Sequence, residues 1–473
     1  MTNLFIQAMQ KEDLIGENGM PTNSTSGMPL VDLFFKMGGA RATSELELLK
    51  YFVKSFNTTP LATMRCLFYN RDIRQGQGER RTFRIFFSWL VNNYPEIAAK
   101  NLHLIPIFGR WDDVWATTFE TNLFPLAADF ILSGLKKGDK LCAKWMPREN
   151  KKFGKVAKEL MKLWELTPRN YRLTLAGNTQ VVESKMCKNK WEEINYSHVP
   201  SLAMNRYRKA FSKHDAERFV SWLEDVKSGK NNAKVNAGAI YPHQIVSPFL
   251  HNYNLKRDQA DLLEEQWKAL PDFMPKNKYC IPVCDVSGSM SGEPMEVSIS
   301  LGLYTAQKNV GPFKNALITF SDNPDFHFLQ SKKLGDMVKE ISQMHWGMNT
   351  NLERTFNLIL RQAIKFNVPA EEMPQYIIIF SDMQFDQCTR GRDLTAIKMI
   401  ERQYNSAGYE RPNIIFWNLR NSIGIPVSFD QSGTALVSGF SPSILKSVFS
   451  LNMNPLQIVI DTIGKEIYDV VSI

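Results

Sequence analysis

The sequence predicts a multidomain protein in which an all-α helical-repeat region precedes an α/β domain of doubly wound, Rossmann-like architecture. Before residue 270, apolar residues recur at helical spacing, with almost no strand-like alternation. After residue 276, short runs that are apolar throughout alternate with helical stretches, which is typical of a parallel sheet covered on both faces. A chain of 473 residues is also too long for one hydrophobic core.

The first half is predicted to be a series of helices. Ser44 is suited to begin one helix and Thr59, followed by Pro60, to begin the next. Many helices of similar length with short connections favour stacked, HEAT-like pairs, although no fixed repeat period is present. The first 28 residues, rich in Gly, Asn, Ser and Thr, are expected to form a loosely ordered arm. Further helices are expected at 80–93, 95–103, 110–117, 125–135, 154–164, 202–212 and 215–227.

The second half is predicted to alternate strands and helices, so that the domains are 1–28, 29–275 and 276–473. Sheets of this kind bind ligands at the carboxyl ends of their strands, near a topological switch point. Strands are expected at 279–284, 316–320, 326–328, 376–380, 413–417 and 433–437. Helices are expected near 295–306, 333–342, 351–366, 392–406, 442–450 and 454–470.

Polar side chains follow the predicted strands where a ligand site is expected. Asp285, Ser287 and Ser289 alternate directly after the first strand of this half. Thr350 precedes a helical stretch, and Asp382 comes at the end of strand 376–380. Turn chemistry accounts for any one of these residues. The five together, in register with strands, favour a small all-oxygen site for Mg²⁺ or Mn²⁺.

These five residues resemble the metal-ion-dependent adhesion site of von Willebrand factor A domains, whose pattern is DxSxS, then Thr, then Asp. The resemblance covers roughly residues 276–473. It implies a bound Mg²⁺ or Mn²⁺ with one coordination position left open for an acidic group of a protein partner.

Charge is unevenly distributed along the chain. Residues 51–250 hold 32 Lys and Arg against 18 Asp and Glu, a net charge of +14. Residues 276–473 hold 18 against 19, a net charge of −1. A basic region joined to a neutral one predicts binding of a polyanion, most simply nucleic acid, by the basic region. The alternative is a solvated, Lys-rich helical surface.

The arginine loop, residues 71–81, is the most prominent basic motif. Its arginines flank two glycines between predicted helices, and guanidinium groups bind phosphate in bidentate fashion. The glycine spacing does not match a Walker loop. Other basic residues alternate with tryptophans, which suits stacking and phosphate contact with RNA. For each basic cluster the alternative is ordinary charge on a solvated helix surface. The segment 109–113 could equally be a helix N-terminus, where Asp is favoured in the first turn. The predicted RNA-binding residues are Arg71, Arg74, Arg80, Arg81, Arg110, Lys144, Arg148, Lys185, Lys188 and Lys190.

A wider resemblance rests on Leu33-Phe34-Phe35, the arginine loop, the segments 108–114 and 196–201, and the DxSxS motif. These segments look like an uncharacterised intracellular family of plants, fungi and large DNA viruses. More distantly, the domain order and the Gly-Arg-Trp-Asp segment are similar to the Ro autoantigen family, which joins a helical TROVE module to a von Willebrand A domain. That resemblance implies helical repeats that bind structured RNA on a basic face and single-stranded RNA ends in a central hole. Whether the helices close into a ring stays open.

The predicted function is that of a non-catalytic, cytoplasmic RNA-binding protein whose metal site recruits a partner or sets conformation. The alternatives are a metal-dependent protein scaffold without RNA and a metal-dependent nuclease. Hydrolysis by two metal ions needs several carboxylates, and only Asp285 and Asp382 belong to the motif, with Asp322 and Asp386 on neighbouring loops. Neither a signal peptide nor an apolar run long enough to span a membrane is recognisable. The six cysteines show no metal-ligand spacing.

Overall fold

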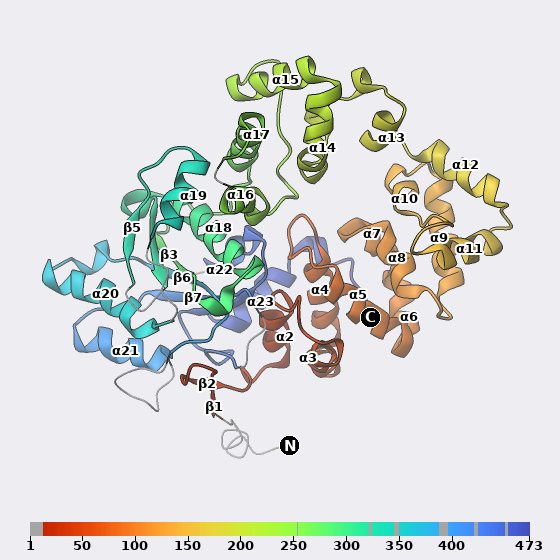
Figure 1. The fold of residues 1–473 in the computed structure, drawn as a ribbon. Coiled ribbons are helices and arrows are strands. Elements are labelled where there is room, and N and C mark those ends of the chain that lie inside the picture. The colour runs from red at the N-terminus through yellow and green to blue at the C-terminus, as the bar shows by residue number, and fades with distance from the viewer. Residues whose placement is uncertain are drawn as a thin grey trace. The chain divides into compact units, whose positions relative to one another are not determined.

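The computed structural model describes residues 13–252, 254–320, 324–344, 350–386, 396–420, 424–449 and 453–473. Contacts between residues divide the chain into two compact units (Figure 1). Unit 1 consists of Met1–Thr58 and Ile240–Lys465, and unit 2 consists of Thr59–Ala239 and Glu466–Ile473.

Unit 1 is built on a six-stranded sheet with the order β5-β4-β3-β6-β7-β8. Neighbouring strands are parallel except β4 and β5, which are antiparallel. Strands β3, β4, β6 and β8 are buried along their whole length, which explains why their sequences are apolar on both faces. The strands are β3 (Cys280–Asp285), β4 (Ala316–Phe320), β5 (Phe326–Phe328), β6 (Tyr376–Ser381), β7 (Asn413–Asn418) and β8 (Thr434–Ser438).

The strand order creates a switch point between β3 and β6. From β3 the chain moves outward to β4 and β5, and then returns to place β6 on the other side of β3. The loops that follow β3 and β6 therefore emerge side by side at the same edge of the sheet. This is where ligands bind in open α/β sheets.

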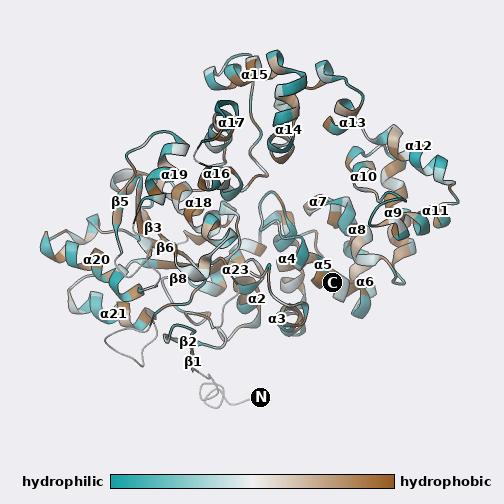
Figure 2. Cartoon of the chain, viewed as in Figure 1, coloured by the Kyte–Doolittle hydropathy of each residue, from teal (hydrophilic) through white to brown (hydrophobic). Residues whose placement is uncertain are grey.

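Helices cover the sheet of unit 1. Helix α18 (Glu293–Lys308) packs on β3, β4 and β6, whereas α20 (Leu352–Lys365) contacts β4 and α21 (Ala396–Ser406). Figure 1 shows α18 and α19 (Leu334–Ser342) on one side of the strands and α20 and α21 on the other. In Figure 2 the strands are mostly brown, while α20 and α21 carry much teal. The predicted α/β architecture is therefore present.

The N-terminal segment belongs to unit 1 and not to the helical unit, which corrects the predicted domain 29–275. Helix α2 (Pro29–Met37) packs on β8 and on α23 (Pro455–Ile463) because nearly all of its side chains are apolar and buried. Polar groups fix it further: the Ser438 hydroxyl donates to the carbonyl of Phe34 over 2.7 Å, and the Lys36 ammonium donates to the carbonyl of Gly424 over 2.8 Å.

Other predicted boundaries in unit 1 also differ. The helices α3 (Glu45–Thr58), α16 (Pro242–His251) and α17 (Arg257–Lys268) lie in this unit as well. Residues 13–23, predicted to be a loose arm, form the hairpin β1 (Asp13–Ile15) and β2 (Pro21–Asn23). The predicted helix 454–470 ends at Ile463, and the predicted helix 442–450 contains only α22 (Leu445–Val448) after a short 3-10 turn. The predicted helix start at 392–395 lies outside the described residues.

Unit 2 is helical, and the sequence predicted most of its helices. Consecutive helices pack together, among them α4 with α5, α8 with α9, and α14 with α15. The stacking of these helices as HEAT-like repeats stays a prediction. The helices are α4 (Pro60–Arg71), α5 (Arg81–Asn93), α6 (Pro95–Asn101), α7 (Ile105–Phe108), α8 (Trp111–Thr118), α9 (Phe124–Lys136), α10 (Lys140–Trp145), α11 (Gly154–Leu163), α12 (Pro168–Asn178), α13 (Val182–Cys187), α14 (Ser201–His214) and α15 (Ala216–Ser228).

The last eight residues of the chain complete unit 2. The Tyr468 ring is buried against Tyr69 and Phe108, and its hydroxyl donates to the Asp72 carboxylate over 2.9 Å. Nothing in the local sequence around Tyr468 indicates this placement, because the partners lie about 400 positions earlier. Among the described residues, no helix combines the length and the apolar composition that crossing a bilayer requires.

Candidate metal centre and nucleic-acid interface

The predicted metal ligands begin at the switch point of the sheet. Asp285 ends β3 and Asp382 directly follows β6, so parallel pairing of the two strands brings both carboxylates to one edge. Both are buried, with exposed fractions of 0% for Asp285 and 3% for Asp382. One Asp285 oxygen accepts the backbone N–H of Ser287 over 2.9 Å, and the other accepts the hydroxyl of Ser381 over 2.5 Å.

Hydroxyl groups connect the two carboxylates. The Ser287 and Ser289 hydroxyl oxygens lie 3.0 Å apart, and Ser289 also hydrogen-bonds to the Asp382 carboxylate. Thr350 is buried, and its hydroxyl donates to the carbonyl of Gln384, two residues after Asp382. The structure thus links four of the five predicted ligands directly and Thr350 through the Asp382 loop.

Of the two further carboxylates considered for this site, the structure describes Asp386 and does not describe Asp322. The backbone N–H of Asp386 donates to the carbonyl of Thr350 over 2.9 Å, so the Asp386 backbone helps to hold the second loop. Asp322 lies outside the described residues, as do residues 345–349, which precede Thr350.

The electrostatics of the site favour a cation. Burial raises the pKa of Asp285 to about 7, and the negative charge of Asp382 acts in the same direction. Burial also raises the pKa of Asp382, opposed by its hydrogen bond from Ser289 and by the charge of Arg420. Two buried carboxylates that repel each other, with hydroxyls between them, suit one hard divalent cation. Among the described residues, no group of three or more His, Cys, Asp or Glu side chains could hold a metal, so this part of the chain does not supply a carboxylate-rich two-metal centre.

The N-terminal hairpin contacts the same loops, which the sequence did not indicate. The Asn18 side-chain amide donates to the Thr350 hydroxyl over 3.3 Å and to the carbonyl of Gln384 over 3.0 Å. The backbone N–H of Glu17 donates to the side-chain oxygen of Gln384 over 2.8 Å. Sequence reasoning missed these residues because they lie more than 300 positions from the loops, in a segment of turn-forming composition.

The arginine loop of unit 2 serves partly as internal structure. Arg71 is 2% exposed, and its guanidinium pairs with the Asp113 carboxylate, with both N···O distances at 2.8 Å. A buried guanidinium held in this way cannot also contact a phosphate, so the predicted RNA-binding role of Arg71 is corrected to a structural one. Two glycines are also required by packing. A Cβ on Gly76 of the loop would lie 2.0 Å from the carbonyl oxygen of Tyr69, and a Cβ on Gly109, before α8, would lie 2.7 Å from the Arg71 Nε.

The network continues from Asp113 to the surface. Arg84 Nε lies 2.7 Å from one Asp113 oxygen, and another Arg84 nitrogen lies 2.9 Å from Asp112. Arg110 pairs with Asp112, and its guanidinium lies over the Trp145 ring at 3.6 Å from the ring centre. The segment 109–113 is thus a helix N-terminus, as one of its two interpretations held, and it also positions Arg110.

Positive charge exceeds negative charge in this network. Partial burial, although Arg80 is largely exposed, and the charges of Arg110 and Arg84 lower the pKa of Arg80, so these three arginines lie close together. We refer to Arg80, Arg84 and Arg110 as the arginine cluster. Arg84 was not predicted, although its position four residues after Arg80, at helical spacing, is a signal that could have identified it.

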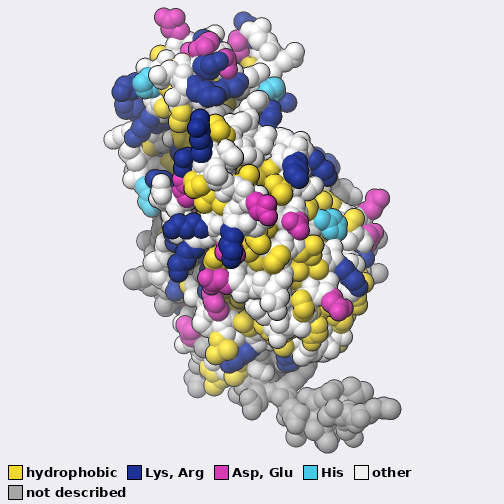
Figure 3. All heavy atoms as spheres, turned by 90° about the vertical axis from the view of Figure 1, so that its right-hand side faces the viewer, with side chains coloured by type: hydrophobic (Ala, Val, Ile, Leu, Met, Phe, Trp, Pro, Cys, Tyr) yellow, Lys and Arg dark blue, Asp and Glu magenta, His cyan; other side chains and the backbone are white. Residues whose placement is uncertain are grey.

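The other predicted RNA-binding residues differ in how far they are already engaged. Lys144 pairs with Glu183 at 2.9 Å, Lys190 pairs with Glu193, Lys185 donates to the carbonyl of Glu193, and Arg74 donates to the carbonyl of Ile107. Arg80, Arg81, Arg148 and Lys188 are exposed and form no ion pair with any described residue. In Figure 3, which faces the right-hand side of Figure 1, Lys and Arg side chains gather in several groups.

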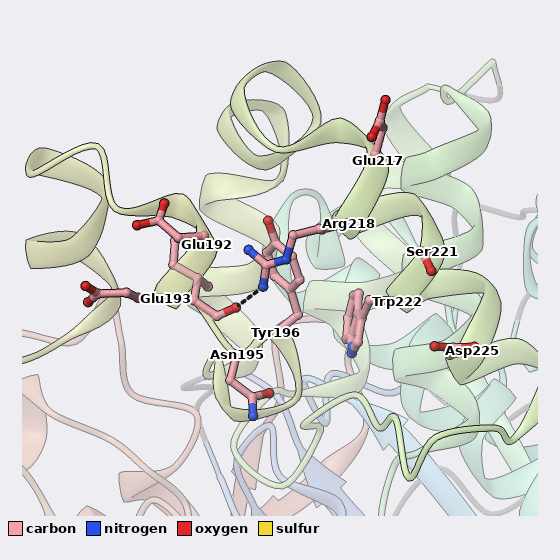
Figure 4. Close-up of a pocket in the computed structure, with 10 residues that line it drawn as sticks. Glu192, Glu193, Asn195, Tyr196, Glu217, Arg218, Ser221, Trp222 and Asp225 are labelled. Atoms are coloured by element: carbon pink, nitrogen blue, oxygen red, sulfur yellow. Dashed lines mark hydrogen bonds between the residues drawn. The ribbon is translucent and has the colours of Figure 1, made fainter.

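A separate pocket of about 590 Å³ in unit 2 contains none of the predicted RNA-binding residues (Figure 4). Four carboxylates and one guanidinium line it, so its charge disfavours phosphate. The Arg218 guanidinium crosses the pocket and donates to the carbonyl of Ile194 over 2.9 Å. The lining residues are Glu192, Glu193, Ile194, Asn195, Tyr196, Glu217, Arg218, Ser221, Trp222 and Asp225.

Comparisons with known proteins agree with this architecture. The crystal structure of the Ro (RSR) protein of Deinococcus radiodurans has a TM-score of 0.51 at 11% identity, covering 93% of this chain and all of that chain. At that identity the likeness is one of fold alone, and it supports the predicted Ro-like fold. An uncharacterised protein of Acanthamoeba polyphaga mimivirus is 29% identical over 502 residues, covering 94% of this chain and 86% of that protein. The predicted occurrence of relatives in plants and fungi stays a prediction.

Two family models match the chain. Residues 279–458 match a domain of unknown function, DUF7788, which covers most of the sheet of unit 1. Residues 16–114 and 138–277 match a second domain of unknown function, DUF2828, and together make up more than half of the chain. The chain therefore belongs to the DUF2828 family.

Proposed function

We propose that this protein binds RNA through unit 2, and that unit 1 is a von Willebrand factor A-type domain whose metal site takes Mg²⁺ or Mn²⁺. The observation that carries the RNA proposal is the arginine cluster beside Trp145. It lies in a unit that holds 31 Lys and Arg against 20 Asp and Glu, a net charge of +11. Unit 1 holds 26 against 28, a net charge of −2.

The arginine cluster has the properties of a phosphate site. Asp112 and Asp113 hold Arg84, and Asp112 and the Trp145 ring hold Arg110, so two guanidiniums are oriented before any ligand arrives. Arg80 adds a third positive charge that no described carboxylate pairs with. A phosphate beside these side chains would relieve their mutual repulsion and accept charge-assisted hydrogen bonds from the guanidinium N–H groups.

The Ro-like fold makes RNA the preferred polyanion. The sequence resemblance to the Ro family implies RNA binding by the helical region, and the likeness of fold to a Ro protein supports transferring that expectation. The metal part of the proposal is supported by the paired buried carboxylates and the hydroxyls of Ser287, Ser289 and Thr350. In von Willebrand A domains such a site recruits an acidic group or sets the conformation of the domain.

The RNA proposal is tested with two charge-matched double variants of the full chain. Arg80→Glu/Arg81→Glu changes two exposed cations of unit 2, and Lys332→Glu/Lys333→Glu makes the same change in net charge on unit 1. Binding of labelled single-stranded poly(U) and of a hairpin RNA is measured by fluorescence anisotropy at increasing salt. We expect the first variant to bind about tenfold or more weakly, with a shallower salt slope, since each lost phosphate contact removes ~0.7 to 0.9 from the slope.

Two results would overturn the RNA proposal. One is a wild-type chain that binds neither RNA at low salt. The other is an equal loss of affinity in both double variants, which would show a general effect of net charge and no site on unit 2.

A further inference from the structure

The β1–β2 hairpin is attached to the same edge of the sheet as the metal loops. Gly19 forms a β-bridge with Asp386, and Asn23 forms another with Ile425, where the two backbones exchange hydrogen bonds of 3.1 and 2.8 Å. Met20 is buried at the turn side of the hairpin, where a small cavity is lined in part by Met383 and Phe385. The hairpin is therefore anchored to the Asp382 loop at several points.

The turn of this hairpin, residues 16–19, faces the metal site. Asn18 donates to the hydroxyl of Thr350, which is one of the proposed ligands, and Gln384 accepts hydrogen bonds from both Glu17 and Asn18. The Glu17 side chain is exposed and has no partner that the structure records. Its backbone lies one residue from Asn18 and is itself bonded to Gln384, so the side chain starts beside the loops that carry Thr350 and Asp382.

We propose that Glu17 is the acidic group that fills the open coordination position of the metal, so that the first partner of the site is the chain's own N-terminal hairpin. This inference rests on the metal site proposed above. A third carboxylate beside two buried ones is unfavourable without a cation and favourable with one, because the cation attracts all three.

The proposal requires the Glu17 side chain to change its rotamer. In the structure the carboxylates of Glu17, Asp285 and Asp382 are not gathered into one ligand group. The backbone of Glu17 is anchored to Gln384, whereas its side chain is exposed and turns about its own three bonds. In the proposed complex this side chain rotates to turn a carboxylate oxygen toward the metal, directly or through one bound water.

One consequence is competition. An acidic group from another protein can reach the metal only when the Glu17 carboxylate has left it, so binding of a partner and coordination by Glu17 exclude each other. Loss of the hairpin contacts would therefore open the site to a partner.

The experiment titrates the full chain with Mn²⁺, followed by electron paramagnetic resonance of the free ion and by calorimetry. Glu17→Gln removes the proposed ligand charge with little change of shape. Glu371→Gln is the matched control, since Glu371 is an exposed carboxylate that precedes β6, at the opposite end of that strand from the metal loops. Asp285→Asn tests the site itself. We expect Glu17→Gln to bind Mn²⁺ about 10-fold more weakly, Glu371→Gln to match wild type, and Asp285→Asn to lose binding.

Hydrogen exchange of the hairpin amides is the second measurement. Mn²⁺ should slow exchange in residues 14–23 of the wild-type chain and should have no such effect in Glu17→Gln. If wild type binds no Mn²⁺, the proposed metal site itself fails. If wild type binds Mn²⁺, Asp285→Asn does not, and Glu17→Gln matches wild type in both measurements, the metal site stands and the role of Glu17 is overturned.

Discussion

Short motifs predicted both the metal edge of unit 1, which is the sheet edge that carries Asp285 and Asp382, and the arginine loop of unit 2. The structure agrees with the predicted side-chain placement at the first and differs from it in part at the second. At the metal edge, four of the five predicted residues are linked directly and the fifth lies on an adjoining loop. In the arginine loop, Arg71 points inward, whereas Arg81 is exposed. The end of a buried parallel strand fixes where the next side chains go, whereas a loop between helices leaves their direction to tertiary packing. A motif therefore predicts the placement of its side chains best when its own secondary structure dictates their orientation.

The largest expected effect on stability concerns Asp113, the buried carboxylate that pairs with Arg71 of the arginine loop. Asp113→Ala leaves the Arg71 guanidinium buried without its carboxylate, which should lower the free energy of unfolding by about 3 to 5 kcal/mol. Urea denaturation followed by tryptophan fluorescence measures the change, and hydrogen exchange in α5 and α8 assigns it to unit 2. A loss below about 1 kcal/mol would show that Arg71 reaches solvent and would remove the contrast with the metal edge.

A second comparison uses two helical glycines. A Cβ on Gly302 of α18 would lie 2.0 Å from the Cys284 sulfur, whereas one on Gly177 of α12 meets nothing within 4 Å. We expect Gly302→Ala to destabilise unit 1 by about 1 to 3 kcal/mol through overpacking. Gly177→Ala should instead stabilise unit 2 by about 0.5 to 1 kcal/mol, because alanine loses less backbone entropy in a helix. Thermal unfolding of both variants checks the opposite signs, and shifts of the same sign would contradict the packing of α18 on β3.

The free energy of unfolding should depend on pH through His243 of unit 1, whose pKa is lowered in the folded protein. Burial, and secondly the charge of Arg41, lowers the pKa of His243 to about 3. Glu293 lies 3.7 Å from the His243 ring, but this is too long for a hydrogen bond and the Glu293 carboxylate already pairs with Arg41, so burial dominates. Because the folded-state pKa lies below the unfolded-state value near 6.5, the unfolded chain takes up the proton first. The contribution of the neutral His243 ring to the free energy of unfolding is therefore full above pH ~6.5 and is lost as the pH falls toward 3.

The measurement is the stability difference between wild type and His243→Phe as a function of pH. Between pH ~6.5 and ~5.5 this difference should shift by about 1 kcal/mol in favour of the variant. His214→Phe, at an exposed histidine of α14, is the control for the loss of a histidine. A constant difference between wild type and His243→Phe would mean that solvent reaches the buried ring.

The smallest expected effect sharpens the contrast within the arginine loop. Arg81→Gln removes an exposed guanidinium and should change the free energy of unfolding by no more than about 0.5 kcal/mol. The same variant should bind poly(U) more weakly than wild type under the conditions of the RNA assay. Asp113→Ala thus tests the internal ion pair of the arginine loop, and Arg81→Gln tests its exposed surface. Normal RNA affinity in Arg81→Gln would remove Arg81 from the interface.

The sheet and the metal loops could be predicted because their information is local. Strands β3 to β8 are apolar runs of strand length, and the DxSxS motif directly follows one of them. The docking of α2 on β8 and the burial of Tyr468 could not be predicted, since each depends on partners hundreds of positions away. The hydrogen bond from Asn18 to Thr350 could not be predicted for the same reason. Composition predicted a loosely ordered arm there, whereas residues 13–23 form a docked hairpin, because composition holds no information about what such a segment packs against.

The division of the chain between the units bears on how the protein is made. Residues 59–239 leave the ribosome early, yet the Tyr468 ring that fills the space beside Tyr69 and Phe108 is synthesised after all other segments of both units. Helix α2 likewise emerges long before β8, the strand that it covers. Neither unit can complete its packing before residues 434–473 have been synthesised, so α2 lacks the strand that it covers until then.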